Sequence, residues 1–280
     1  MPHWQSVLNA EVIRIRPLSS GHNARLSIVD VADGRVLVAK EATAPNAKLD
    51  IEGRMLRYLA EHSELPVPHV WHNSADLLMM DHLPDDGRMT PKAEQQAAEA
   101  LAALHQVQGK QFGLDWDTLI GPLHQPNSPS SSWVEFFAQQ RLWHMAKAAH
   151  DEGKLPADLL HKLEAFLPQL PHLLSEPKFP ALIHGDAWQG NVLCGANGLS
   201  GFIDPAIYYG HPEVELAFTT LFGTFSERFY HHYDAHNPIA DGFWEIRKDV
   251  YNLYPLLVHV RLYGSSYLSA VESTVKKFQK

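Results

Sequence analysis

The spacing of the hydrophobic residues changes near residue 84, and this change constrains the fold more than any other feature of the chain. Before it, apolar residues alternate as in strands, and Asp33-Gly34 is a strong hairpin signal between two such segments. Strands are predicted at 24–31, 35–42 and 76–83, and a helix is predicted at 49–62. The stretch 84–89 (PDDGRM) is typical of a linker.

After the linker, the apolar spacing becomes mainly helical. Thr90 and Pro91 suit the N-cap and first position of a helix that extends to Val107. Further helices are predicted at 133–150, at 156–174 with breaks near Pro168 and Pro171, and from about 213 onward; a strand is predicted at 199–204. The pattern predicts an α+β fold with two lobes, a small β-rich lobe at 1–83 and a larger, mostly helical lobe at 84–280.

Composition excludes several classes of protein. The formal net charge of −9 argues against a general nucleic-acid binder, which would carry a basic surface. A single cysteine, Cys194, excludes an intrachain disulfide and fits a reducing compartment. We see neither a signal-peptide pattern nor an apolar run long enough to cross a bilayer. The chain is therefore expected to be a soluble, cytoplasmic protein without nucleic-acid or membrane partners.

The stretch LIHGDAWQGNVL, residues 182–193, places a polar loop between two apolar ends that resemble strands. Either it is an ordinary hairpin turn, or its polar residues are held there for chemistry. Asp186 precedes Asn191 by five positions, the spacing of a phosphotransfer catalytic loop in which Asp accepts the substrate proton and Asn holds magnesium. Asp204 follows at the end of an apolar strand, where a second carboxylate for Mg²⁺ is expected, because a triphosphate must be charge-neutralised during transfer.

The first lobe supplies the other parts of such a site. Lys40 ends the strand VLVAK, a position suited to contact nucleotide phosphates. Glu52, on the following helix, is the candidate ion-pair partner that holds this lysine. The stretch 19–23 (SSGHN) lies where a phosphate-covering loop is expected, although it has one glycine.

Each of these residues also has an ordinary interpretation, as a turn, a solvated lysine or a surface glutamate. Their joint order along the chain favours the catalytic interpretation. Two other classes of protein stay open at this point. One is a catalytically silent nucleotide-binding protein, which the presence of all five polar residues disfavours. The other is metal-dependent hydrolysis at His184 and Asp186, which would need more ligands than lie nearby.

Three segments resemble the aminoglycoside and choline phosphotransferase superfamily, whose fold is similar to that of protein kinases: LLMMDHL, HGDAWQGNVL and FIDPAIYYGHPEVELA. Within it, the chain is identified as similar to the fructosamine kinase (ketosamine-3-kinase) family. The motifs H-G-D-x-W-x-G-N and D-P-A-x-Y-Y-G, followed by Glu215-Leu216-Ala217, carry this resemblance. Segments near 112–127, 133–142 and 251–264 extend it over nearly the whole chain.

The resemblance implies transfer of phosphate from MgATP to the 3-hydroxyl of fructosamines or ribulosamines, after which the unstable product releases the amine. It implies that Asp186 is the base, that Asn191 and Asp204 bind Mg²⁺, and that Lys40 with Glu52 anchors the phosphates. The segment Met80, Asp81 and His82 would meet adenine, and Trp188, with Tyr208 or His211, would line the substrate pocket. The partner would be a free or protein-bound ketosamine, and the chain a monomer or weak dimer.

One departure from the family pattern concerns the first helix. Relatives often carry a second acidic residue where this chain has Arg54, so Glu52 is the one acidic candidate there and the local charge changes. The same chemistry on an aminoglycoside or a choline-like amine remains the alternative substrate class. His232 and His236 have the spacing of two ligands on one helical face, but no Glu completes the H-E-x-x-H zinc pattern and no metal is expected there.

Overall fold

The computed structural model describes residues 2–20, 23–44 and 47–278. Its N-terminal part is a five-stranded antiparallel sheet with strand order β1-β2-β3-β5-β4. The strands are β1 (Val12–Ser20), β2 (Ala24–Val31), β3 (Val36–Ala42), β4 (Val70–Asn73) and β5 (Leu77–Asp81). The predicted Asp-Gly turn joins β2 and β3, where Gly34 adopts the positive φ that such a turn requires. This hairpin is confirmed.

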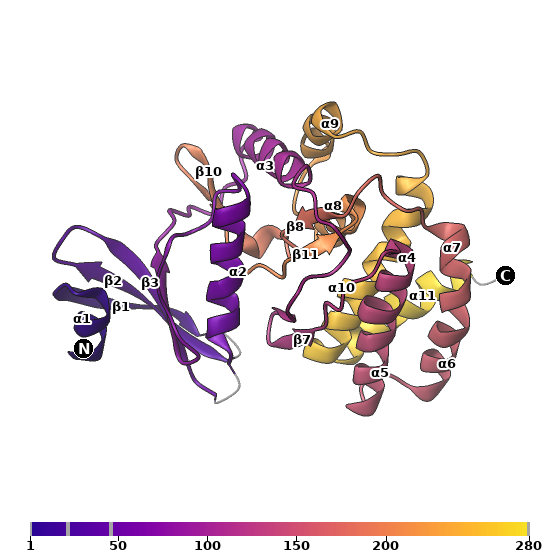
Figure 1. Cartoon of the computed structure of the whole chain (residues 1–280), viewed down its shortest axis with the longest axis horizontal. Coiled ribbons are helices and arrows are strands. Elements are labelled where there is room, and N and C mark those ends of the chain that lie inside the picture. Colours follow the sequence, from indigo (N-terminus) through magenta and orange to yellow (C-terminus); the bar gives the residue numbers. More distant parts are fainter. Residues whose placement is uncertain (1, 21–22, 45–46, 279–280) are drawn as a thin grey trace.

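Helices cover both faces of this sheet. Helix α1 (Pro2–Leu8) packs on one face, where Trp4 and Leu8 join a buried cluster with Val29 and Leu37. Helix α2 (Leu49–His62), whose predicted bounds are confirmed, packs on the other face. In Figure 1, α2 lies between the sheet and the helical part of the molecule.

The helical part follows an irregular segment after β5. Its α-helices are α3 (Pro91–Leu104), α4 (Trp133–Phe136), α5 (His144–Asp151), α6 (Ala157–Phe166), α7 (Leu170–Leu173), α8 (Pro212–Leu221), α9 (Glu227–His236), α10 (Lys248–Tyr263) and α11 (Leu268–Phe278). The Thr90 hydroxyl caps α3 by accepting the Ala93 N–H, as predicted. The break predicted near Pro168 and Pro171 is confirmed by a 3₁₀ turn, Leu167–Gln169, between α6 and α7. The helix predicted at 133–150 instead contains a π-helical stretch, Phe137–Trp143.

Three two-stranded antiparallel sheets complete this part. They pair β6 (Thr118–Ile120) with β7 (Leu123–Gln125), β8 (Ala181–Ile183) with β11 (Tyr208–Gly210), and β9 (Val192–Gly195) with β10 (Gly198–Phe202). The largest hydrophobic cluster fills the helical part and also takes in Met55 and Leu59 of α2. The molecule is thus a bilobal α+β fold with an apolar contact between its lobes. The boundary at residues 83 and 84 lies in the irregular segment and stays a prediction.

Candidate active site

The polar loop at 184–191 is not the turn of a hairpin. Strand β8, which leads into it, pairs with β11, whereas β9, which leaves it, pairs with β10. The two flanking strands therefore belong to different sheets, and the loop spans the space between them. Its backbone is joined to the segment 203–206, because the Ile203 N–H donates to the Asn191 carbonyl at 3.0 Å and the Ala206 N–H to the His184 carbonyl at 2.8 Å.

Gly185 makes this approach possible. It has a φ of 84°, in the region that favours glycine, and a Cβ there would lie 2.1 Å from the Ala206 carbonyl oxygen. Any side chain would push the loop away from the segment that carries Asp204. The glycine of the H-G-D motif is therefore a packing requirement of the site.

Asp186 and Asn191 lie in direct contact. The Asn191 amide donates to the Asp186 carbonyl and to Asp186 Oδ2, both at 2.9 Å. Within the described part of the chain, Asp186 Oδ1 and Asn191 Oδ1 accept no hydrogen bond, so one oxygen of each side chain stays available. Burial and the nearby Asp204 carboxylate raise the pKa of Asp186 well above its usual value. A carboxylate with raised proton affinity is suited to accept a proton from a hydroxyl group.

Lys40 joins the two lobes of the site. Its Nζ donates to Glu52 Oε1 at 2.6 Å and to Asp204 Oδ1. Burial alone would lower the pKa of this lysine, but the two carboxylates raise it above its ordinary value, so the ammonium stays charged. The same ammonium holds the pKa of Asp204 below its usual range despite burial. Lys40, Glu52 and Asp204, from three separate elements, therefore form one ionic cluster.

Asp204 also has an unusual backbone. Its φ is 53°, the left-handed region that Asp and Asn enter more readily than other side-chain-bearing residues. Side chains of the β6–β7 hairpin hold the segment that follows: Gln125 donates to the Ala206 carbonyl at 3.0 Å and Thr118 to the Ile207 carbonyl at 3.2 Å. This hairpin was not predicted from the sequence, and its role in the site was missed.

Glu215, in α8, holds the start of the catalytic loop. Its buried carboxylate accepts the backbone N–H groups of His184 at 3.0 Å and Gly185 at 2.6 Å, and it lies 2.9 Å from His105 Nε2. Burial alone would raise the pKa of Glu215, but the hydrogen bond and the charge of His105 lower it by more. The net shift of this pKa is therefore downward. The sequence placed Glu215 in a family segment but assigned it no role. The signal available in the sequence was a pair of glutamates, Glu213 and Glu215, at the start of an otherwise apolar helix.

A cavity of about 330 Å³ opens beside the ionic cluster. Ala24 and Leu26 of β2 line it from the sheet, and Gly121 and Pro122 of the β6–β7 hairpin line it from the helical part. The segment predicted to cover phosphates runs up to this cavity through Asn23, but Gly21 and His22 lie outside the described residues. The cavity therefore places open space next to Lys40 and Asp204.

The oxygen donors fit a magnesium ion. The Asp204 carboxylate and the Asn191 amide oxygen are hard ligands from the two sides of the site, and Asn191 uses its nitrogen, not this oxygen, to bind Asp186. Among the described residues, no group of three or more His, Cys, Asp or Glu side chains could enclose a metal. Such a set suits Mg²⁺, which is commonly held by one or two protein ligands together with substrate phosphates and water.

The segment predicted to meet adenine lies at the end of β5. Met80 is buried opposite Val38 of β3. The Asp81 N–H donates to the His69 carbonyl and the His82 N–H to the Val36 carbonyl, each at 3.0 Å. Both amides are therefore used inside the sheet and cannot bind an adenine ring nitrogen. Leu83 follows them, and its N–H has no hydrogen-bond partner among the residues that the structure describes.

Two residues predicted to line the substrate pocket lie in the core. Tyr208 is 1% exposed and stacks against the Arg141 guanidinium at 3.9 Å. His211 is also buried, and its Nδ1 accepts the Glu213 N–H as the cap of α8. Side chains alternate along β11, so Tyr208 points inward whereas Tyr209 lines an open cavity. Tyr208 and His211 are therefore buried in the core and do not lie at the surface of an open substrate pocket, as had been predicted.

Trp188 differs from these two residues, because it is 37% exposed within the catalytic loop. Its ring meets Phe222 edge-on, with centroids 6.0 Å apart, and the Phe222 ring lies 4.8 Å from that of His259. The helical part thus presents aromatic surface next to Asp186. A molecule bound at Asp186 would meet this surface.

Comparison with known proteins identifies the class to which this fold and site belong. A profile of the fructosamine kinase family matches residues 4–280. A protein named "probable ketoamine kinase VP1481" from Vibrio parahaemolyticus is 36% identical over 238 residues, which cover 82% of this chain and 80% of the relative. Escherichia coli YniA, also named a probable ketoamine kinase, is 33% identical over 238 residues, 81% of this chain and 79% of its own.

Solved structures agree with the sequence relatives. A crystal structure named as a candidate fructosamine-3-kinase from Thermobifida fusca YX-ER1 has a TM-score of 0.91 at 34% identity and covers 98% of this chain and 96% of its own. A streptomycin–ATP complex of the aminoglycoside phosphotransferase APH(2")-IIa has a TM-score of 0.66 at 17% identity, covers 99% and 95% of the two chains, and supports the fold alone. The chain belongs to the fructosamine kinase family, a family of ATP-dependent phosphotransferases. Among the described residues, no helix is both long and apolar enough to span a membrane.

Proposed function

We propose that this protein transfers the γ-phosphoryl group of MgATP to the 3-hydroxyl of a ketosamine, and that the phosphorylated product then releases its amine. The observation that carries the proposal is the convergence of Lys40, Glu52 and Asp204 with the Asp186–Asn191 pair in a member of this family. The cluster provides a positive charge for phosphates, oxygen donors for a cation and a carboxylate for the hydroxyl proton.

In this proposal, Asp186 orients the acceptor hydroxyl and takes its proton through Oδ1, while Asn191 holds Oδ2 in place. Lys40, positioned by Glu52, binds the phosphates of ATP. Asp204 and Asn191 would hold Mg²⁺, which when bound neutralises charge on the triphosphate. Lys40 then exchanges part of its contact with Asp204 for the nucleotide.

We propose that the adenine base binds next to the Met80–His82 segment, but not through the N–H groups of Asp81 and His82. The Asp81 and His82 N–H groups are used in the sheet, which leaves the Leu83 N–H as the nearby donor for an adenine ring nitrogen. Met80, buried opposite Val38, would contribute apolar contact behind the base. For the sugar and amine, Trp188 supplies exposed aromatic surface beside Asp186.

The substrate class is tested by measuring ADP release with four acceptors: fructosyl-lysine, ribulosyl-lysine, an aminoglycoside and choline. We expect turnover with one or both ketosamines and none above background with the others. Turnover restricted to the aminoglycoside or to choline would keep the phosphotransferase and overturn the ketosamine. Bound ATP without turnover on any acceptor would favour a silent nucleotide-binding protein.

The role of Asp204 is tested by Asp204→Ala. We expect kcat to fall by about 10²-fold or more and the Mg²⁺ concentration for half-maximal activity to rise, because one oxygen ligand and the partner of Lys40 are lost together. A magnesium titration of activity measures both effects. Asp241→Ala, at an exposed carboxylate, is the control. An unchanged magnesium dependence in Asp204→Ala would remove Asp204 from the metal site.

A further inference from the structure

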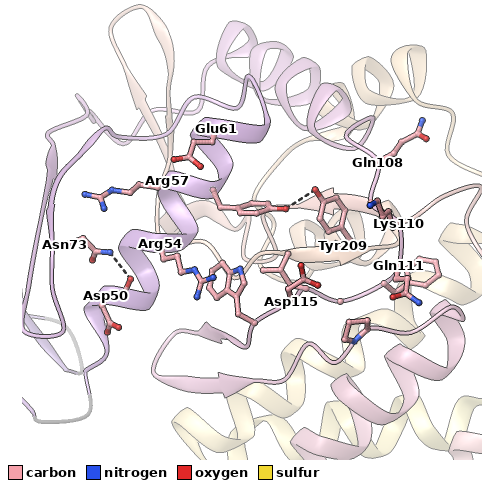
Figure 2. A pocket seen from close by; sticks show the side chains of 17 residues that line it. Asp50, Arg54, Arg57, Glu61, Asn73, Gln108, Lys110, Gln111, Asp115 and Tyr209 are labelled. Atoms are coloured by element: carbon pink, nitrogen blue, oxygen red, sulfur yellow. Dashed lines mark hydrogen bonds between the residues drawn. The ribbon is translucent and has the colours of Figure 1, made fainter.

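A second cavity lies behind α2, on the face opposite Glu52. Its volume is about 970 Å³, and it is bounded by the outer face of α2 and by the loop at 108–116. Tyr58 of α2 and Tyr209 of β11 form a hydrogen bond of 3.1 Å between their hydroxyl groups at its base. Figure 2 shows Arg54 projecting from α2 toward the loop that carries Lys110, Gln111 and Asp115. Nothing in the proposed catalytic mechanism uses this cavity.

Arg54 is held in a defined position, but no anionic partner lies on it among the residues that the structure describes. Its guanidinium carbon lies 4.0 Å from the centroid of the Trp116 ring. Asp50 lies four residues earlier on the same helix, the spacing at which Lys147 and Asp151 form an ion pair on α5, but Asp50 and Arg54 form none in the described structure. Because the guanidinium stacks on Trp116, its N–H groups remain available at the cavity wall.

The facing loop also carries charges without partners. Within the residues that the structure describes, neither Lys110 nor Asp115 takes part in an ion pair or a side-chain hydrogen bond. By contrast, Lys147 and Asp151 on the exposed face of α5 form an ion pair of 2.7 Å. The cavity thus presents positive and negative side chains on α2 as well as on the loop.

The charges that line the cavity balance. They are Arg54, Arg57 and Lys110 on the positive side and Asp50, Glu61 and Asp115 on the negative side. A ligand with only negative charge would approach Asp115, and one with only positive charge would approach Arg54 and Lys110, so each would meet repulsion. A ligand that carries both charges can satisfy both sets of groups.

We propose that this cavity binds a small zwitterion with the chemistry of an amino acid or short peptide. Its carboxylate lies between Arg54 and Lys110, and its ammonium group lies against Asp115. The hydroxyl groups of Tyr58 and Tyr209 provide hydrogen bonds for the polar atoms between these ends. The cavity volume falls within the range of small-molecule sites. This inference goes beyond the proposed function and does not depend on it.

The position of the cavity links it to both halves of the active site. Helix α2 carries Glu52, the partner of Lys40, on its inner face. Strand β11 carries Tyr209 and pairs with β8, which leads into the catalytic loop. An occupant would therefore contact two elements that position the catalytic residues.

Calorimetric titration of the full chain with L-alanyl-L-alanine tests the proposal. Two matched probes each lack one charge: N-acetyl-L-alanyl-L-alanine has no ammonium group, and L-alanyl-L-alanine amide has no carboxylate. We expect saturable binding of the dipeptide, and binding of each blocked probe that is weaker by about tenfold or more. Absence of saturable binding, or equal binding of all three probes, would overturn the proposal.

Two exposed substitutions assign the binding to this cavity. Arg54→Gln is expected to weaken the dipeptide by about tenfold, without further weakening the amide probe, which has already lost its carboxylate. Asp115→Asn is likewise expected to weaken binding of the dipeptide by about tenfold. It should not further weaken binding of the acetylated probe, which has already lost its ammonium group. Arg14→Gln, an equivalent charge loss on β1, is the control and should change nothing. Binding that is unaffected by Arg54→Gln and Asp115→Asn would show that the dipeptide lies elsewhere.

Discussion

Replacing Asp186 with asparagine is expected to lower kcat by about 10²–10⁴-fold while leaving ATP binding within about threefold of the native value. Asparagine keeps the shape of the side chain and still offers an oxygen to the Asn191 amide, which donates to Asp186 Oδ2 at 2.9 Å. The loop should therefore keep its conformation. An amide cannot take up the hydroxyl proton, so the loss should fall on the transfer step.

The measurement is steady-state kinetics in ATP and in the acceptor, together with direct titration of ATP binding. Asp241→Asn makes the same chemical change at an exposed carboxylate and should leave both quantities unchanged. Native turnover in Asp186→Asn would exclude Asp186 as the base. A parallel loss of ATP binding would show that the carboxylate acts on the nucleotide site instead.

Replacing Glu215 with alanine is expected to lower the free energy of unfolding by about 3 kcal/mol or more, because several buried donors lose their acceptor and each costs about 1–3 kcal/mol. These donors are the N–H groups of His184 and Gly185, with His105 Nε2 alongside. At about 2–4 °C per kcal/mol for a chain of this size class, Tm should fall by roughly 6–12 °C. Chemical denaturation measures the free energy directly.

Two variants complete this test. Glu64→Ala removes an exposed glutamate and should change stability by less than about 0.5 kcal/mol. Glu215→Gln keeps one acceptor oxygen but turns an amide toward backbone donors, so its stability should lie between the native and alanine values. A Glu215→Ala protein as stable as Glu64→Ala would contradict the role assigned to this carboxylate.

The stabilisation from Glu215 also has a defined pH dependence. Its pKa in the folded protein is lowered from an ordinary value of 4.5. The contribution is therefore complete above that value and is lost as the pH falls through the lowered, folded-state pKa. The stability difference between the native protein and Glu215→Ala should accordingly shrink in acid.

Features set by local sequence were predicted well. The Asp-Gly hairpin, the bounds of α2, the Thr90 cap and the break between α6 and α7 each depend on residues close together in the chain. The sequence spacing put Asp186 and Asn191 in one loop, and the structure adds that the two side chains are hydrogen-bonded, which was not predicted.

Features set by distant pairing were missed. Strand β8 pairs with β11, which lies beyond both the catalytic loop and the β9–β10 hairpin in the chain. Strands β1 and β4 complete the N-terminal sheet, although their sequences show no strong alternation of apolar and polar residues. The register of β11 decides that Tyr208 is buried and that Tyr209 lines the cavity. A shift of the strand by one residue would exchange the two side chains. Glu215 was likewise hidden, because only the folded chain brings α8 to the catalytic loop.

The central claim is that the site phosphorylates the 3-hydroxyl of a ketosamine, and proton-coupled ³¹P NMR of the products tests it most directly. Fructosyl-lysine would be incubated with MgATP and the native protein, with Asp186→Asn in parallel. We predict a new phosphate-ester signal that a ¹H–³¹P correlation connects to the proton at carbon 3, present with the native protein and absent with the variant. A phosphate ester at another carbon, or no new ester while ATP is bound, would contradict the account.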